Sequence, residues 1–202
     1  MKAQGEYYYE KVLETIKKIP GLPIVEIGTD KGTTAVLAMN ALRDNNDKRW
    51  FFTIDPYGDK PYKAGGDLQN SMGYDDSAYL STISALYKKA HDNKLNYLHW
   101  KLMSLDFIKM FPEVQFWSGG RVLPQQFAFA FLDGDHHWNP VFEEFMWFYE
   151  RMPEGGVICI DDYNLIGGET EVRQRITVAG DWFFNEADGH YRCYFTKCTL
   201  KK

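Results

Sequence analysis

The stretch IVEIGTDKGT, residues 24–33, decides the fold, because it passes from a short apolar strand through a glycine turn into a helix. That helix extends over residues 33–42. Before the stretch, residues 6–19 place apolar side chains at helical spacing, and Pro20-Gly21 ends this N-terminal helical segment of residues 1–20. A strand between two helices is the building unit of layered α/β folds.

The same alternation of strand and helix continues along the chain. It favours βαβ units and therefore a doubly wound, mostly parallel sheet with helices on both faces. Near the C-terminus, residues 170–177 are compatible with a helix, and strands at 182–185 and 191–196 predict an antiparallel hairpin at the sheet edge. The other predicted strands are 23–28, 50–55, 95–101, 127–132 and 157–160, and the other predicted helices are 77–93, 105–111 and 140–151.

The composition fits a single globular domain over residues 1–202. Lys and Arg number 23 and Asp and Glu 28, and the net charge of −5 argues against binding to nucleic acid or anionic membranes. The longest apolar run, residues 127–132, is far shorter than the roughly 20 residues that cross a bilayer. Three cysteines without a C-x-x-C pair fit a reducing cytoplasm. We expect a cytoplasmic protein with a small-molecule partner, as a monomer or a homo-oligomer.

One long irregular stretch, residues 57–76, interrupts the alternation. It contains several glycines and a proline but little apolar periodicity. A loop of this length in a compact domain is usually functional or disordered. We predict that it acts as a lid or a substrate loop.

Carboxylates gather at the carboxyl ends of the predicted strands. Ligands bind at this edge of an open α/β sheet, near the point where the strand order reverses. We therefore expect the functional site on this rim. The acidic residues at the strand ends are Glu26, Asp55, Asp133, Asp161 and Asp162.

The glycine turn after the first strand has the pattern E-x-G-x-x-x-G, from Glu26 to Gly32. It matches neither the dinucleotide loop nor the phosphate-binding P-loop. Glu26 would repel a phosphate but could hold a cationic amine, and Asp55 is placed to accept hydrogen bonds from a ribose. A plain strand-to-helix turn and an Asp55-Pro56 turn are the alternatives. Together the two features favour a nucleoside site.

Asp133, Asp161 and Asp162 form a second candidate cluster, at the ends of two strands that we expect to be neighbours. Converging carboxylates raise one another's pKa unless a cation neutralises them, and Mg²⁺ prefers such oxygen ligands. His136 stands beside the cluster and is suited to act as a general base. The alternatives are that the aspartates are caps or turn residues and that a histidine caps the next helix.

These motifs together resemble the class I S-adenosylmethionine-dependent methyltransferases over residues 24–163. The resemblance is carried by VEIGTDKGT at 25–33, FLDGDH at 131–136 and PEGGVICIDDY at 153–163. More narrowly, the chain is similar to the metal-dependent O-methyltransferases, both the catechol and caffeoyl-coenzyme A type and the macrolide-sugar and cephalosporin-tailoring branch. The resemblance implies a Rossmann-like, seven-stranded sheet and a single methyltransferase domain.

The resemblance also implies a function: O-methylation of a hydroxyl on a sugar, a catechol or a natural product, with S-adenosylmethionine and Mg²⁺. Asp30 departs from the middle glycine that is common in the family's loop, and Leu102 departs from a glycine that is usual before Ser104. The implied site has Glu26, Gly28, Thr29 and Gly32 around the methionine part, Asp55 on the ribose and Ser104 at the adenine. It also has Asp133, Asp161 and Asp162 on the metal, with His136 as the base, and Asp133 at both cofactor and reaction centre.

The sequence also allows two other functions. Asp133-Gly134-Asp135 could be the metal-binding D-x-D of a nucleotide-sugar glycosyltransferase, although this leaves Asp55 and the paired Asp161-Asp162 unexplained. The chain could also be a binding module that keeps a nucleoside pocket without turnover. A nicotinamide oxidoreductase is disfavoured because its glycine signature is absent.

Overall fold

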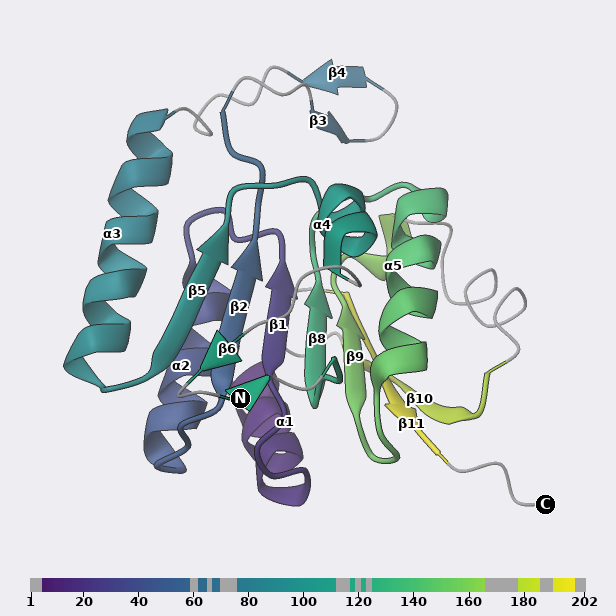
Figure 1. The fold of residues 1–202 in the computed structure, drawn as a ribbon. Helices are drawn as coiled ribbons and strands as arrows, with labels where there is room; N and C mark the ends of the chain where they lie inside the picture. The colour runs from purple at the N-terminus through teal and green to yellow at the C-terminus, as the bar shows by residue number, and fades with distance from the viewer. Residues whose placement is uncertain are drawn as a thin grey trace.

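A computed structural model describes residues 5–58, 62–64, 67–69, 76–111, 117–118, 121–122, 125–165, 178–185 and 191–198. At its centre is one seven-stranded sheet, sandwiched between helices (Figure 1). The sheet consists of β1 (Ile24–Ile27), β2 (Trp50–Ile54), β5 (Asn96–Trp100), β8 (Phe129–Leu132), β9 (Val157–Ile160), β10 (Gly180–Asn185) and β11 (Arg192–Lys197).

The strand order is β10-β11-β9-β8-β1-β2-β5. Strands β9, β8, β1, β2 and β5 are parallel, whereas β11 runs antiparallel to both β9 and β10. From β1 the chain adds strands first on the β2 side and then on the β8 side, so the order reverses at β1. The predicted mostly parallel sheet with an antiparallel C-terminal hairpin is confirmed.

Helices cover both faces of the sheet, as predicted. Side chains alternate along each strand, so that Ile24 and Phe129 join the core under α1, α2 and α3, while Val25 and Phe52 join the core under α4 and α5. The helices are α1 (Glu6–Lys18), α2 (Thr33–Asp44), α3 (Asp76–Asp92), α4 (Ser104–Met110) and α5 (Trp138–Arg151). Among the described residues, no helix combines the length and apolar character needed to cross a membrane.

Two small hairpins were not predicted. One consists of β3 (Tyr62–Ala64) and β4 (Asp67–Gln69), and the other of β6 (Trp117–Ser118) and β7 (Arg121–Val122). The first belongs to the irregular stretch 57–76, and Figure 1 shows it beyond the carboxyl ends of the central strands. Its role as a lid stays a prediction. Residues 59–61, 65–66 and 70–75 of that stretch, and the helix expected at 170–177, lie outside the described residues.

Candidate cofactor and active site

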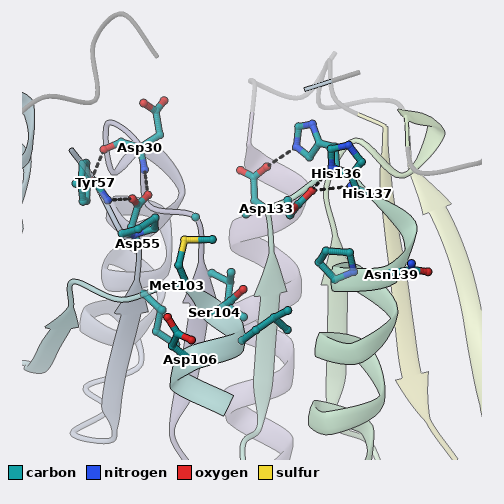
Figure 2. Close-up of a pocket in the computed structure, with 18 of the residues that line it drawn as sticks. Asp30, Asp55, Tyr57, Met103, Ser104, Asp106, Asp133, His136, His137 and Asn139 are labelled. Carbon is teal, nitrogen blue, oxygen red and sulfur yellow. Dashed lines mark hydrogen bonds and ion pairs between the residues drawn. The ribbon is translucent and has the colours of Figure 1, made fainter. Parts of the chain in front are cut away.

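A cavity of about 980 Å³ opens at the carboxyl ends of β1, β2 and β8 (Figure 2). It therefore lies where the strand order reverses, which is the position that the sequence predicts. Gly28, Asp55 and Tyr57 belong to one wall, and residues 133–140 form the opposite wall. Residues 103–106, at the start of α4, lie between the two walls.

The cavity is acidic. Among the described residues it is lined by five aspartates and by Lys109, together with two histidines. An excess of carboxylates favours a cationic ligand and disfavours the pyrophosphate of a dinucleotide or a nucleotide sugar. The five aspartates are Asp30, Asp55, Asp106, Asp133 and Asp135.

Asp55 is held by the backbone of the loop after β1. Its Oδ2 accepts hydrogen bonds from the backbone N–H groups of Thr29 and Asp30 at 2.8 and 3.1 Å, and its Oδ1 accepts one from Tyr57 at 2.9 Å. Burial raises the pKa of Asp55, and these three hydrogen bonds oppose the shift. A carboxylate offers about four lone-pair sites, so these three hydrogen bonds leave Asp55 about one site for a further donor such as the predicted ribose hydroxyl.

Asp30, at a position where the resembling family commonly has a glycine, adopts a backbone conformation that favours glycine. Its φ is 42°, in the left-handed region that glycine adopts freely and that aspartate tolerates better than most residues. The departure noted in the sequence therefore leaves the backbone conformation of a glycine in place. It also adds a carboxylate to the lining of the cavity.

Gly28 joins the two walls of the cavity. With φ at 82°, a Cβ built on this residue would lie 2.0 Å from the backbone oxygen of Asp133. No side chain fits into that space, so the close approach of the β1 loop to the end of β8 requires glycine. Gly28 thus shapes the site by letting two backbones meet, and its place beside the methionine part of the cofactor stays a prediction.

Three residues predicted at the cofactor, Glu26, Thr29 and Gly32, do not line the cavity. Glu26 is fully buried on the same face of β1 as Ile24, and its oxygens have no hydrogen-bond partner by geometry among the described residues. Burial, followed by the charge of Asp133, raises the pKa of Glu26 well above its usual value. Glu26 thus lies outside the lining of the cavity, and its contact with a cationic amine stays a prediction.

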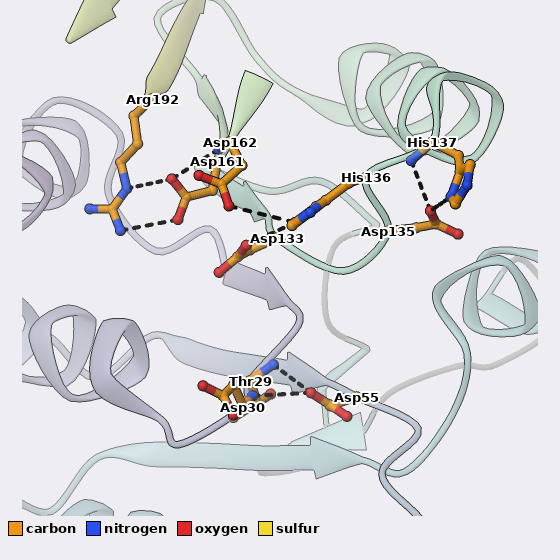
Figure 3. A network of polar contacts seen from close by, with 10 residues as sticks. All are labelled: Thr29, Asp30, Asp55, Asp133, Asp135, His136, His137, Asp161, Asp162 and Arg192. Atoms are coloured by element: carbon orange, nitrogen blue, oxygen red, sulfur yellow. Dashed lines mark hydrogen bonds and ion pairs between the residues drawn. The ribbon is translucent and has the colours of Figure 1, made fainter. Parts of the chain in front are cut away.

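Asp133 and His136 face each other on the opposite wall (Figure 3). Nε2 of His136 lies 3.7 Å from Oδ1 of Asp133 and 4.0 Å from Oδ2 of Asp162. Burial raises the pKa of Asp133 to about 6, while the neighbouring His136 opposes the shift. The Asp133 carboxylate in turn raises the pKa of His136. The structure therefore brings together three of the residues that the sequence placed at the reaction centre.

The predicted metal ligands do not form a magnesium site as they lie. Asp161 turns away from Asp133 and pairs with Arg192 of β11, whose Nε and Nη2 donate to Oδ1 and Oδ2 at 3.1 and 3.3 Å. Asp133 and Asp162 face His136 instead. In the part of the chain that the structure describes, no three His, Cys, Asp or Glu side chains are arranged to hold a metal ion. The side chains of Asp133, Asp161 and Asp162 thus do not fit a Mg²⁺ ion as they are arranged. Arg192, which pairs with Asp161, is the residue that the sequence analysis did not single out.

The two aspartates of the D-x-D motif, Asp133 and Asp135, contact different histidines. The carboxylate of Asp135 accepts hydrogen bonds from the backbone N–H of His137, at 2.8 Å, and from the ring of the same residue. Asp133 faces His136. The two carboxylates therefore are not placed together as the joint metal ligands that a glycosyltransferase would need.

Further residues of the site were not singled out from the sequence. Ser104 lines the cavity as expected, and Met103, Asp106 and Lys109 line it beside Ser104. Their position at the start of α4, just after β5, follows from the rule that strand ends build the site. Glu144 of α5 does not line the cavity but lies buried near Ser104, where burial raises its pKa to about 8 and Ser104 opposes the shift. A lone acidic residue on a helix gives no sequence signal for such a position.

A family model described as a methyltransferase domain matches residues 25–163. The chain belongs to this methyltransferase family. The match spans the glycine turn, Asp55, the Asp133–His136 pair and Asp161-Asp162, so the predicted membership in the class I methyltransferases is confirmed.

Solved structures share the fold of this methyltransferase at low identity. An O-methyltransferase from Bacillus cereus in complex with SAH is 13% identical, with 95% of this chain and 81% of that chain covered and a TM-score of 0.58. TomG, an O-methyltransferase from Streptomyces achromogenes in complex with SAM, is 13% identical over 95% and 80% of the two chains, with a TM-score of 0.56. An rRNA methylase from Streptococcus thermophilus is 10% identical over 98% and 99%, also with a TM-score of 0.56. Among curated proteins, no sequence matches.

Proposed function

We propose that this methyltransferase transfers the methyl group of S-adenosylmethionine to a hydroxyl group of a small molecule. The observation that carries the proposal is the single cavity of about 980 Å³, which joins the glycine turn of β1 to the Asp133–His136 pair. S-Adenosylmethionine carries a sulfonium and an amine, and the acidic lining suits such a cation. O-Methyltransferases among the solved structures, crystallised with SAM or SAH, support the choice of cofactor and of oxygen as the acceptor atom.

In this proposal the two walls have separate tasks. Gly28, Asp55 and the start of α4 bind and orient the nucleoside, while His136 handles the proton. His136 takes the hydroxyl proton at Nε2 as the acceptor oxygen bonds to the methyl carbon, and the electrons of the broken S–C bond stay on sulfur. Asp133 stabilises the protonated imidazole that results. The proposed reaction passes through no metal ion, because Asp161 is committed to Arg192.

Calorimetry with S-adenosylmethionine and S-adenosylhomocysteine tests the cofactor half of the proposal. We expect both to bind stoichiometrically, whereas NAD and a nucleotide sugar should give no heat because their pyrophosphates meet the acidic lining. Asp55→Ala should weaken binding, and Arg43→Gln, on the exposed surface of α2, is the matched control. Failure of S-adenosylmethionine to bind the wild-type protein would contradict the proposal.

Release of S-adenosylhomocysteine tests the transfer half. A panel of sugar, catechol and natural-product hydroxyls should include at least one acceptor that supports turnover, and loss of the acceptor hydroxyl should abolish it. Cofactor binding with no product across the panel would instead support a binding module that retains the pocket without turnover.

A further inference from the structure

Arg192 places a permanent positive charge beneath the acidic rim. Its residue exposure is 3%, and that of Asp161 is also 3%. The antiparallel register of β11 against β9 pairs Cys193 with Ile160. Arg192, which precedes Cys193, therefore lies beside Asp161, which follows Ile160. Both carboxylate oxygens of Asp161 accept a hydrogen bond from the guanidinium. A charge-assisted, two-pronged contact of this kind is the strong form of an ion pair.

This pairing occupies the place that a divalent ion would need. A metal ion bound to Asp161 would lie next to a buried guanidinium, and like charges at short range in a low-dielectric environment repel strongly. Arg192 also lowers the pKa of Glu26 and of Cys159, opposing the effect of their burial. Its charge therefore acts on residues of β1 and β9 as well as on Asp161.

The same pair fixes the geometry of the rim. Oδ1 of Asp161 accepts a hydrogen bond from the backbone N–H of Asp162 at 3.1 Å. Asp162 has a φ of 47°, a left-handed conformation that costs energy for a residue other than glycine. In this conformation Oδ2 of Asp162 comes within 4.0 Å of His136 Nε2. Figure 3 shows the resulting chain from Arg192 through Asp161 and Asp162 to His136.

We propose that Arg192 is the built-in counter-cation of this rim: it neutralises Asp161, holds Asp162 toward His136, and removes the need for a divalent metal ion. Arg192 is a positioning residue, since it acts on His136 through two aspartates. The inference rests on the proposed methyl transfer for the reaction it serves. The arrangement of charges can be tested without any methyl acceptor.

Electron paramagnetic resonance with Mn²⁺ alone is the first test, because Mn²⁺ shares the carboxylate preference of Mg²⁺. Wild-type protein should leave the free-Mn²⁺ signal unchanged at millimolar metal, and calorimetric binding of S-adenosylmethionine should be the same with EDTA and with Mg²⁺. The inference would be overturned if the wild-type protein bound Mn²⁺ stoichiometrically, with loss of the free-Mn²⁺ signal, and Asp161→Asn did not. Failure of S-adenosylmethionine to bind would instead count against the proposed function, so the two failures are distinct.

Removal of the Arg192 guanidinium should create a binding site for a divalent metal ion at Asp161. We expect Arg192→Met to bind Mn²⁺ with a clear loss of the free signal, because Asp161 is then released. A folded Arg192→Met that binds no Mn²⁺ contradicts the proposal. Arg192→Lys keeps the charge but loses the two-pronged contact, so it should bind no Mn²⁺, and Mn²⁺ binding by this variant would also contradict the proposal, even if Arg192→Met does not fold.

Ring ¹⁵N resonances of His136 test the positioning role. Arg192→Lys should bind no Mn²⁺ but should shift these resonances, since Asp162 is no longer held in place. The matched control is Arg49→Lys, another buried arginine paired with an aspartate, Asp47, at 2.7 Å. Arg49 also donates to the backbone oxygens of Leu22 and Ile16, away from the cavity, so its replacement should leave His136 unchanged. Unshifted His136 resonances in Arg192→Lys would refute the positioning role.

Discussion

Two aspartates stand on either side of the loop that follows β1, and they differ in what surrounds them. Asp55 comes directly after β2 and Asp133 directly after β8, and both strands pair with β1. The carboxylate of Asp55 accepts hydrogen bonds from three backbone N–H groups at 2.8 to 3.1 Å. Oδ1 of Asp133 instead faces the ring of His136, 3.7 Å away. Equivalent places in the sheet therefore carry different chemistry.

The difference shows how one cavity divides its work. Backbone donors oppose the rise in the pKa of Asp55 that burial causes, so its charge is stabilised by the fold itself. Burial raises the pKa of Asp133 to about 6, and a side chain that titrates stands opposite. In the proposed function, Asp55 belongs to a fixed wall that binds the nucleoside, whereas Asp133 and His136 form a reactive wall that can exchange protons.

The largest expected effect is on the reactive wall. His136→Gln should lower the rate of methyl transfer by roughly 10²–10⁴-fold, the usual contribution of a general base. Affinity for S-adenosylmethionine should stay close to the wild-type value, because the fixed wall is intact. His91→Gln, in a side chain that is 90% exposed on α3, is the control. Turnover of His136→Gln at the wild-type rate would remove His136 from the mechanism.

A substitution in the fixed wall should mainly lower the stability of the protein. Asp55→Ala leaves three backbone N–H groups without their acceptor, and we expect unfolding free energy to fall by roughly 3 kcal/mol. Asp133→Ala should cost less than about 1 kcal/mol, since its raised pKa shows that the ionised form is poorly stabilised. Urea denaturation of the two variants measures both values. Equal losses would mean that the two aspartates are not distinguished as the contacts indicate.

The pH dependence of stability separates the aspartates further. The folded pKa of Asp133, about 6, lies above the unfolded value near 3.9, so the folded protein binds this proton more tightly. Its contribution to stability is thus present at low pH and is lost as the pH rises from about 4 to about 6. Relative to Asp133→Asn, wild-type unfolding free energy should fall by up to about 1.4 kcal/mol per pH unit in that window. Parallel curves from denaturation at several pH values would contradict this expectation.

Much of this architecture follows from local sequence patterns. The β1 turn and the alternating strands predict the sheet, and the sheet in turn predicts a site at the strand ends. Side-chain alternation also explains why Glu26 is buried, because a residue two positions after Ile24 shares its buried face. Applied to β1, the same alternation places Glu26 on the core face of the sheet, while its contact with the cofactor stays a prediction.

The pairing of Arg192 with Asp161 could not be predicted in this way. The two residues are 31 positions apart and meet only through the register of β11 against β9. A one-residue change of register would turn Arg192 to the other face of the sheet. Asp161 therefore looks like a metal ligand in sequence, and only the antiparallel edge shows that its charge is already neutralised.

The smallest expected effect tests whether the fixed wall depends on backbone or on side chain. Asp30→Gly keeps the N–H group that Asp55 accepts and relieves a left-handed φ, which costs about 1 kcal/mol for most residues. Glycine also makes the unfolded chain more flexible, so the net change in unfolding free energy should stay within about 1 kcal/mol. Asp30→Val, which is strained at this φ, should lose more. If Asp30→Gly instead loses cofactor affinity to the same extent as Asp55→Ala, the carboxylate of Asp30 contacts the ligand directly. The fixed wall would then act through two carboxylates, not through backbone geometry alone.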